Sequence, residues 1–353
     1  MKTRLLDYVQ CPICHEPLHV ADPRSFVDED ELERGTLACT ADHRFSVDDG
    51  IPNLVTDHSA KVERTAKQFA YEFMDVGQVA DPEKKRAEDV TLFFAKTGID
   101  PDFYQTPGLD FRIQQDHRQL GYESDYGALA GKLVVDAGSA DGRLAQLVAP
   151  HAGEMILLDL GEHIGEARRR LGHLDHVHFV RCNLVRSPLR HGVADFIYSI
   201  GVLHHTPSLP DALAGLGRAL SSGGELAVWV YPHAYWGNPI KKWIALRIRH
   251  YLLRQRLDRQ LRFIKRYLMP LGRLQMTVAR RRWLKYLLAP LFLVNVPRHE
   301  DRNEMLATVV DYYLPEYIDT YSDKDLEDHF RAAGLTYRAL PFPTSGRGGR
   351  RAG

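Results

Sequence analysis

Residues 132–148 read KLVVDAGSADGRLAQLV, and this stretch decides the fold of the chain. The short run LVV is typical of a strand buried in a parallel sheet, and it ends at Asp136. A turn of small residues follows, with Gly138, Ser139 and Gly142, and then an apolar helical pattern. Such a unit lets backbone N–H groups approach a ligand at the C-terminal edge of the strand. The stretch therefore predicts a ligand-binding strand–turn–helix unit.

Strand-like and helix-like segments alternate after this unit. The segment 153–160, GEMILLDL, reads as a second strand ending at Asp159, 21 residues past Gly138. At that spacing such folds place a carboxylate on ribose hydroxyls, because a carboxylate can accept two hydrogen bonds at once. Further strands are expected at 176–184, 194–205 and 223–232. The alternation predicts an α/β fold with a doubly wound, mainly parallel, Rossmann-like sheet.

Three stretches together resemble a known family: VVDAGSADGR at 134–143, DFIYSIGVLHHTPSLPDAL at 195–213 and RALSSGGELAVWVY at 218–231. They are similar to motifs of class I S-adenosylmethionine-dependent methyltransferases, and the later two to those of the widespread type 11-like subfamily. The resemblance covers about residues 60–340. It implies a methyltransferase domain whose cofactor is S-adenosyl-L-methionine.

The resemblance also assigns cofactor contacts to positions of this chain. It implies that Asp136, Gly138 and Gly142 line the methionine part of the cofactor and that Asp159 holds the ribose. Asn183 stands where the family commonly has an Asp that accepts a hydrogen bond from the adenine amine, and its amide oxygen can accept the same bond. The other residues expected to contact the cofactor are Ser139, Leu160, Leu184 and Ser199.

The turn after the first strand departs from two patterns. A nicotinamide dinucleotide, the rival ligand, normally requires G-x-G-x-x-G at this place, and the spacing from Gly138 to Gly142 does not fit it. In the methyltransferase family Gly is usual at the position of Ala140, where the extra methyl group narrows the turn.

Three cysteines near the N-terminus suggest a metal site. Cys11-x2-Cys14 supplies two ligands on one turn, and Cys39 with His43 supplies two more, as in tetrahedral Cys3His zinc sites. His15 is a rival ligand, and the alternative is a small β domain with unrelated thiols. The flanking CPIC-x3-L and DDGIPNLV resemble the zinc-binding domain that accompanies or activates many methyltransferases, although that family usually has a fourth Cys. The resemblance implies a structural Zn²⁺.

Candidates for a catalytic base follow the fourth and fifth strands. His204 and His205 come directly after the fourth strand, and histidine titrates near neutral pH. His205 is the better candidate, although the pair can instead serve to hold the loop. Tyr231 and His233, after the fifth strand, are weaker candidates.

The chain divides into segments of different composition. We expect a zinc-binding domain at 1–58, a helical lead-in or lid at 59–130, a catalytic domain at 131–235 with 300–342, a basic helical insertion at 236–299 and a flexible tail at 343–353. In the lead-in, Phe69, Tyr71 and Phe73 could cover the cofactor or simply pack. Asp311, Tyr312 and Tyr313 are expected on the acceptor side. The seventh, antiparallel strand usual in this fold is expected to be missing or very short.

The insertion carries most of the charge asymmetry of the chain. Residues 241–285 hold fifteen Lys/Arg and the single acid Asp258, although the whole chain has a formal net charge of zero. One helix is expected from the Asn238 cap to Pro270, and a second over 271–289. The basic surface could be a solvated face, could bind an anionic acceptor or an anionic membrane, or could contact RNA phosphates.

Length and composition bound the function. The chain has 353 residues, of which 44% are apolar, and it lacks both a signal-peptide-like N-terminus and an apolar stretch of about 20 residues. We therefore expect a cytoplasmic enzyme that methylates a small-molecule acceptor or an anionic metabolic or envelope intermediate. The alternatives are an RNA methyltransferase and a non-catalytic scaffold. The acceptor atom and the oligomeric state stay open.

Overall fold

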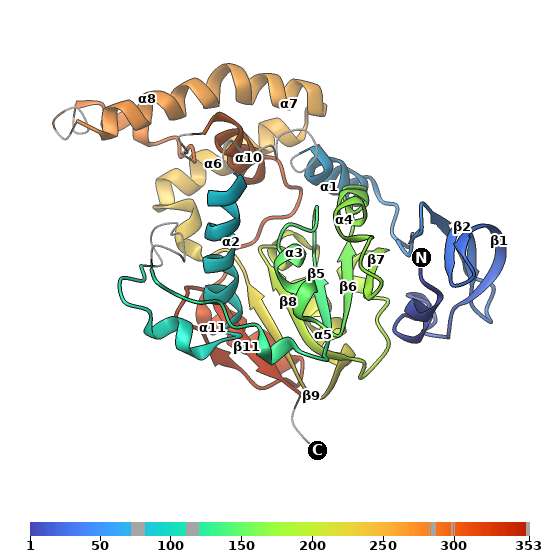
Figure 1. The fold of residues 1–353 in the computed structure, drawn as a ribbon. Coiled ribbons are helices and arrows are strands. Elements are labelled where there is room, and N and C mark those ends of the chain that lie inside the picture. Colours follow the sequence, from blue (N-terminus) through green and yellow to red (C-terminus); the bar gives the residue numbers. More distant parts are fainter. Residues whose placement is uncertain are drawn as a thin grey trace.

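The computed structural model describes residues 1–71, 82–110, 120–281, 283, 287–297, 299 and 301–350. Within these residues seven strands form a central sheet in the order β10-β11-β9-β8-β5-β6-β7 (Figure 1). Neighbouring strands from β9 through β8, β5 and β6 to β7 pair in parallel, which confirms the doubly wound, mainly parallel sheet. The strands are β5 (Leu133–Ala137), β6 (Glu154–Asp159), β7 (Val177–Arg181), β8 (Ala194–Ile200), β9 (Leu220–Trp229), β10 (Arg338–Ala339) and β11 (Ser345–Gly349).

Helices cover both faces of this sheet because successive strand residues point to opposite sides. Val134 packs in one core with Phe93 and Phe94, whereas the next residue, Val135, packs in another core with Leu213 and Phe330. Both faces of the central strands are therefore buried, as the continuous apolar runs indicated. The covering helices are α2 (Pro82–Thr97), α3 (Ala145–Val148) and α4 (Ile164–Leu171) on the first face, and α5 (Leu209–Ala219) and α11 (Asp323–Ala332) on the second.

The C-terminal segment corrects the sequence prediction of a flexible tail at 343–353 with a last strand that is missing or very short. Ser345–Gly349 forms β11, which pairs antiparallel with both β9 and β10. The Arg347 guanidinium donates to the Gly98 carbonyl and pairs with Glu225. A Cβ added at Gly348 would lie 1.9 Å from the Thr336 carbonyl oxygen, so the strand needs glycine there. Glycine-rich sequences are rare in strands, which explains the wrong prediction.

The N-terminal segment forms a small antiparallel sheet that is joined to the edge of the central sheet. The Leu54 N–H donates to the Arg181 carbonyl at the end of β7 (2.8 Å). Leu5, Val9 and Leu37 lie in the same apolar core as residues of the central sheet. The small sheet is therefore continuous with the core beneath β7. Its strands are β1 (His19–Asp28), β2 (Glu31–Ala38), β3 (Arg44–Asp48) and β4 (Ile51–Pro52).

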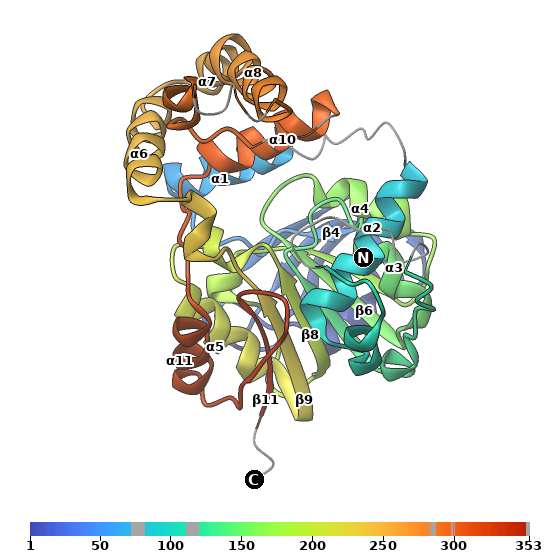
Figure 2. The same ribbon diagram turned by 90° about the vertical axis from the view of Figure 1, so that its left-hand side faces the viewer.

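The insertion is helical, and it packs with two other helices into a separate layer (Figure 2). Leu252, Ile264 and Tyr313 are buried in its own apolar core. Asn238 caps the first helix as predicted, because its side chain accepts from the Lys241 N–H (2.9 Å). The helices of this layer are α6 (Pro239–Leu253), α7 (Leu257–Phe263), α8 (Met269–Ala279), α10 (Arg302–Tyr313) and α1 (Ala60–Ala70).

The helix ends within the insertion differ from the prediction. The predicted first helix is interrupted after Leu253, where the Gln260 side chain donates to the Leu252 carbonyl and caps α6 (2.9 Å). Pro270 does not end a helix, because a π-helical turn, Ile264–Leu268, precedes it and leads directly into α8. A wider turn accommodates a proline ring and its missing N–H, which a regular α-helix does not. None of the described helices has both the length and the apolar character needed to cross a bilayer.

Candidate functional site

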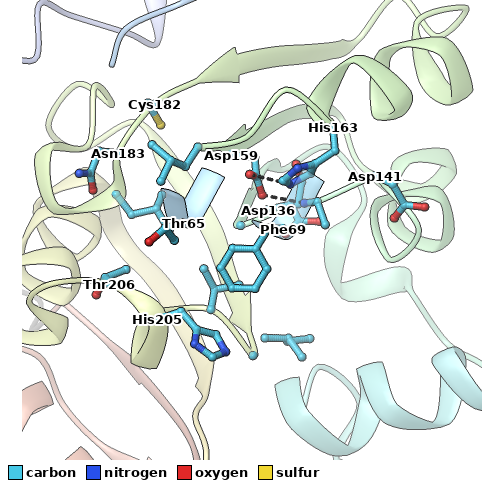
Figure 3. A pocket seen from close by; sticks show the side chains of 18 of the residues that line it. Thr65, Phe69, Asp136, Asp141, Asp159, His163, Cys182, Asn183, His205 and Thr206 are labelled. Atoms are coloured by element: carbon cyan, nitrogen blue, oxygen red, sulfur yellow. Dashed lines mark hydrogen bonds and ion pairs between the residues drawn. The ribbon is translucent and has the colours of Figure 1, made fainter. Parts of the chain in front are cut away.

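A cavity lies at the C-terminal edge of β5, β6, β7 and β8, with α1 against it (Figure 3). This is the edge at which open α/β sheets bind ligands. Val62, Thr65 and Phe69 of α1 contribute to its wall. Of the residues predicted to contact the cofactor, the cavity brings together Asp136, Gly138, Ser139, Asp159, Leu160, Asn183 and Leu184.

The turn after β5 is shaped by close packing. Gly138 has φ +101°, and a Cβ there would lie 2.3 Å from a Val202 methyl group. Gly142 does not line the cavity. A Cβ at Gly142 would lie 2.9 Å from the Ala167 Cβ, so a glycine at this position lets α4 approach the turn. Ala140 has φ +50°, a left-handed conformation that costs a non-glycine residue about 1 kcal/mol. The turn thus places residue 140 in a left-handed conformation although that residue is alanine and not glycine.

Asp159 is held as a carboxylate beside the cavity. Its Oδ2 accepts from the Ala140 N–H (2.8 Å) and its Oδ1 from the Gly161 N–H (2.9 Å). His163 Nε2 lies 2.9 Å from Oδ1. Burial alone would raise the pKa of Asp159, but His163 and the two N–H donors outweigh it and leave the pKa below its usual value. An ionised acceptor at the end of β6 fits a ligand that presents hydroxyl donors.

Asp136 and Ser139 supply two further polar groups. The Tyr198 hydroxyl donates to Asp136 Oδ2 (2.8 Å), and burial raises the pKa of Asp136 to about 8. Asp136 is therefore mostly protonated at neutral pH. The Ser139 Oγ is buried in the cavity wall and has no hydrogen-bond partner in the described part of the chain. A buried hydroxyl without a partner is costly, so a polar ligand would compensate it.

Asn183 and Ser199 use their polar atoms locally. The Asn183 Oδ1 accepts from the Val185 N–H (3.1 Å) and caps a short turn after β7. That oxygen keeps a second lone pair, and the side chain lines the cavity. Ser199 is fully buried outside the cavity lining, and its hydroxyl donates to the Ala137 carbonyl (2.7 Å). Its contact is with the neighbouring strand.

His205 lines the cavity and is oriented by two groups. Its Nδ1 lies 3.0 Å from the Tyr317 carbonyl oxygen, which can only accept, so Nδ1 carries a proton. Its Nε2 lies 3.3 Å from Asp311 Oδ1. The Tyr231 hydroxyl donates to the other oxygen of Asp311 (2.5 Å). The Phe69 ring meets His205 edge-on at 5.2 Å between centroids. With its Nδ1 bonded to the Tyr317 carbonyl, the His205 ring thus turns Nε2 toward Asp311.

The other predicted candidates for a base lie away from the cavity lining. His204 is fully buried against the Tyr231 ring, with centroids 3.8 Å apart. Burial, aided by His205, lowers the pKa of His204 well below its usual value. Tyr231 is not among the lining residues; its hydroxyl bonds to Asp311, which lies beside His205. His233 is exposed on the surface and lies near Asp325.

The predicted metal ligands converge at the N-terminal sheet. The ligand atoms of Cys11, Cys14, Cys39 and His43 all lie within 4.8 Å of one another. The Cys14 and Cys39 sulfurs are 3.5 Å apart, and the His43 Nδ1 lies 3.4 Å from the Cys39 sulfur. A tetrahedral zinc ion would hold such atoms roughly 3.5–3.8 Å apart, so the cluster is compatible with zinc. The rival His15 points to Gln10 instead.

Some cavity residues were not identified from the sequence. Val62 and Thr65 are two of them; with Phe69, which the sequence suggested as a cover for the cofactor, they recur at intervals of three and four, a helical spacing from which a common face could have been inferred. His163 stands four residues after Asp159, close enough for a local pair. Tyr317, far away in the chain, offered no such signal.

Comparisons with known proteins match part of the chain to a family model. Residues 135–228 match a family model described as a methyltransferase domain. Solved structures with limited similarity include an S-adenosylmethionine-dependent methyltransferase from Aquifex aeolicus (12% identity, TM-score 0.35, covering 76% of this chain and 97% of that one).

Two further structures illustrate the range of the matches. One is the complex between the Haloferax volcanii Trm112 methyltransferase activator and a methyltransferase (13% identity, TM-score 0.41, covering 78% of each chain). The other is an S-adenosylmethionine-dependent methyltransferase from Mesorhizobium loti (25% identity, TM-score 0.30, covering 31% of this chain and 51% of that one). Curated proteins gave no match. The assignment of the central domain therefore rests on the family model.

Proposed function

Since residues 135–228 form a domain of this methyltransferase family, we propose that the chain is an S-adenosylmethionine-dependent methyltransferase. The observation that carries the proposal is the cavity, most of whose lining residues lie in the matched span. It joins the ionised Asp159, the neutral Asp136 and the Ser139 hydroxyl at the C-terminal edge of four parallel strands. These groups suit a nucleoside that carries a polar amino-acid tail.

The residues present fit each part of this cofactor. Asp159 would hold the ribose hydroxyls, and Asn183 with Leu184 would border the adenine at the end of β7. Asp136 and Ser139 would meet the methionine part. When bound, the cofactor supplies a methyl group on a sulfonium, which is transferred by in-line displacement. Much of the rate in such a transfer comes from holding the acceptor in line.

We propose His205 as the group that removes a proton from the acceptor. Its Nδ1–H is held by the Tyr317 carbonyl, which leaves Nε2 to take the proton. The Asp311 carboxylate, 3.3 Å from Nε2, would stabilise the imidazolium that forms. Tyr231 would act by positioning Asp311, and His204 would serve as a packed neutral ring. General-base assistance of this kind contributes about 10²–10⁴-fold.

We propose a structural role for zinc at Cys11, Cys14, Cys39 and His43. Four protein ligands leave no open coordination position, and the cluster lies in the N-terminal sheet outside the cavity lining. For the acceptor we propose a small molecule or an anionic metabolic or envelope intermediate, with the atom that receives the methyl group unspecified. RNA and a non-catalytic scaffold remain the alternatives that experiments must separate.

Calorimetric titration with S-adenosylmethionine and S-adenosylhomocysteine tests the proposal. We expect both to bind the unmodified chain, and Asp159→Asn to weaken both ten- to hundredfold, because each hydrogen bond to a charged group contributes about 1.5–3 kcal/mol. Asp328→Asn is the control, because Asp328 is an exposed carboxylate on α11 that pairs with Lys324. Lack of binding by either compound, in protein with a normal thermal midpoint, would contradict the proposal and favour the scaffold.

A further inference from the structure

The insertion presents an unusual concentration of exposed apolar side chains. Among the described residues, nine of the twelve large apolar side chains that are exposed lie between residues 240 and 293. Trp243, Tyr267 and Trp283 are 60–66% exposed. The nine are Ile240, Trp243, Leu246, Tyr251, Tyr267, Leu274, Trp283, Leu287 and Leu293.

Exposed basic side chains are concentrated in the same segment. The segment 241–285 has fifteen Lys/Arg and one acid, a net charge of about +14. Arg259, Arg266 and Arg273 recur at every seventh position and are all exposed. The other exposed basic residues in the described part of the segment are Lys242, Arg247, Arg254, Arg256, Arg262, Lys265, Arg280 and Arg281.

These side chains do not form the core of the insertion. On α6 the buried positions are Ala245, Arg249 and Leu252, whereas Ile240 and Trp243 lie on the opposite face. The buried Arg249 is used internally, donating to the Pro315 carbonyl (2.6 Å). α6 thus has an inner face in the core of the insertion and an outer face that is left exposed. Figure 2 shows α7 and α8 at the outer margin of the molecule, with α10 and α1 beneath them.

We propose that this outer face of the insertion docks on the surface of an anionic bilayer, with its helices lying on the membrane. Interfacial helices combine Lys/Arg on a polar face with Trp, Phe or Leu on the buried side, and each basic residue near an anionic membrane contributes to binding. Tyrosine and tryptophan favour the headgroup region. The long stems of Arg and Lys let their charged ends stay in water beside buried apolar groups.

The aliphatic side chains distinguish a bilayer from a nucleic acid. Single-stranded RNA is bound by basic grooves with aromatic rings on which bases stack. Trp243 and Tyr267 would suit either partner, but Ile240, Leu246 and Leu274 have no stacking surface and are 43–58% exposed. An exposed aliphatic side chain gains free energy only when it moves out of water, as it would in the acyl region of a bilayer. The combination therefore favours lipid.

Vesicle sedimentation with the full chain tests this proposal. We expect the protein to pellet with phosphatidylcholine vesicles that contain about a third phosphatidylglycerol, and not with phosphatidylcholine alone. Arg259→Gln with Arg266→Gln and Arg273→Gln should weaken binding roughly a hundredfold, since each basic residue contributes about fivefold. Ile240→Ser with Leu246→Ser and Leu274→Ser should weaken it at least tenfold, because three apolar side chains no longer leave water.

Matched controls come from the N-terminal sheet, which also exposes single apolar and basic residues. Phe26→Ala and Arg34→Gln change exposed side chains there and should leave vesicle binding unchanged. Far-UV circular dichroism of each variant excludes unfolding as the cause of lost binding. Equal pelleting with both kinds of vesicle, or an aliphatic triple variant that binds like the unmodified chain, overturns the proposal. Failure to pellet together with tight, salt-sensitive binding of polyuridine would assign the surface to RNA instead.

Discussion

The N-terminal sheet and the helical insertion are two additions to the same central sheet, and they are attached in different ways. β1–β3 share one apolar core with β5–β9, and Leu37 lies in that core with Val180. The insertion, α6–α8, builds a separate core with α10, in which Leu252 packs with Val309. The first addition is thus continuous with the central sheet, whereas the second forms a layer of its own.

The difference shows how a sequence rich in charge can serve two purposes. In the N-terminal region, ionic groups are drawn inward: Glu31 is buried and bonded to Lys2 and Arg168, each at 2.9 Å. In the insertion the basic groups point outward, next to exposed aromatic rings such as Trp243. Inward ionic contacts join two segments of the chain. The outward basic side chains of the insertion greatly outnumber the acidic ones, so they can bind an external anion.

The largest expected effect tests the continuity of the N-terminal sheet with the central sheet. Cys39→Ser should remove the zinc and lower the thermal midpoint of the whole protein by more than about 10 °C, because structural zinc contributes several kcal/mol to folding and the core is shared. Metal analysis and calorimetry on one sample measure both. His15→Ala, next to the cluster, is the control and should keep its zinc. A variant with a full zinc content and a normal midpoint would contradict the ligand assignment.

A smaller effect tests the ionic contact between Glu31 of the N-terminal sheet and Arg168 of α4. Burial alone would raise the pKa of Glu31, but hydrogen bonds from Lys2 and Arg168 outweigh it and lower the pKa to about 2. Glu31→Gln should therefore reduce the free energy of unfolding by about 2–3 kcal/mol at pH 7. Because the folded-state pKa is depressed, the unmodified chain should lose this contribution as pH falls from about 4.5 to about 2.

Urea denaturation at pH 7 and at pH 3 measures the Glu31 effect. The difference between Glu31→Gln and the unmodified chain should shrink at the lower pH, where the unmodified chain has lost part of the contribution. Glu29→Gln is the matched control, because Glu29 is exposed in the same hairpin. A difference that is independent of pH would mean that shape, not charge, accounts for the stabilisation.

The smallest expected effect tests the outward orientation of the insertion. Trp243→Ala should change the free energy of unfolding by less than about 0.5 kcal/mol, because the side chain is 64% exposed. Leu252→Ala, on the buried side of the same helix, should cost about 2–5 kcal/mol. Denaturant titration followed by circular dichroism compares the two variants. Equal losses would show that the outer face of α6 is covered in solution.

Local patterns were sufficient for much of the fold and part of the site. The run before Asp136, the acid Asp159 and the ligand spacing from Cys11 to His43 each depend on residues close in sequence, so strand, turn and ligand geometry follow from short-range rules. The same rules failed at the glycine-rich β11 and at Pro270, where tertiary packing and a π-helical turn override ordinary propensities. Phe73, a predicted lid residue, lies outside the described residues.

The sequence by itself determined the class of fold, the cluster of three cysteines and a histidine, and the carboxylate at the end of β6, because these are set by spacing along one or two adjacent elements. Only the tertiary structure decided which of two neighbouring histidines reaches the cavity. It places His205 beside Asp311 and Tyr317, more than a hundred residues away in the chain, and it buries His204. It also decided which face of the basic helices is left to solvent. Burial and long-range partners depend on packing between distant segments, and no local pattern encodes that packing.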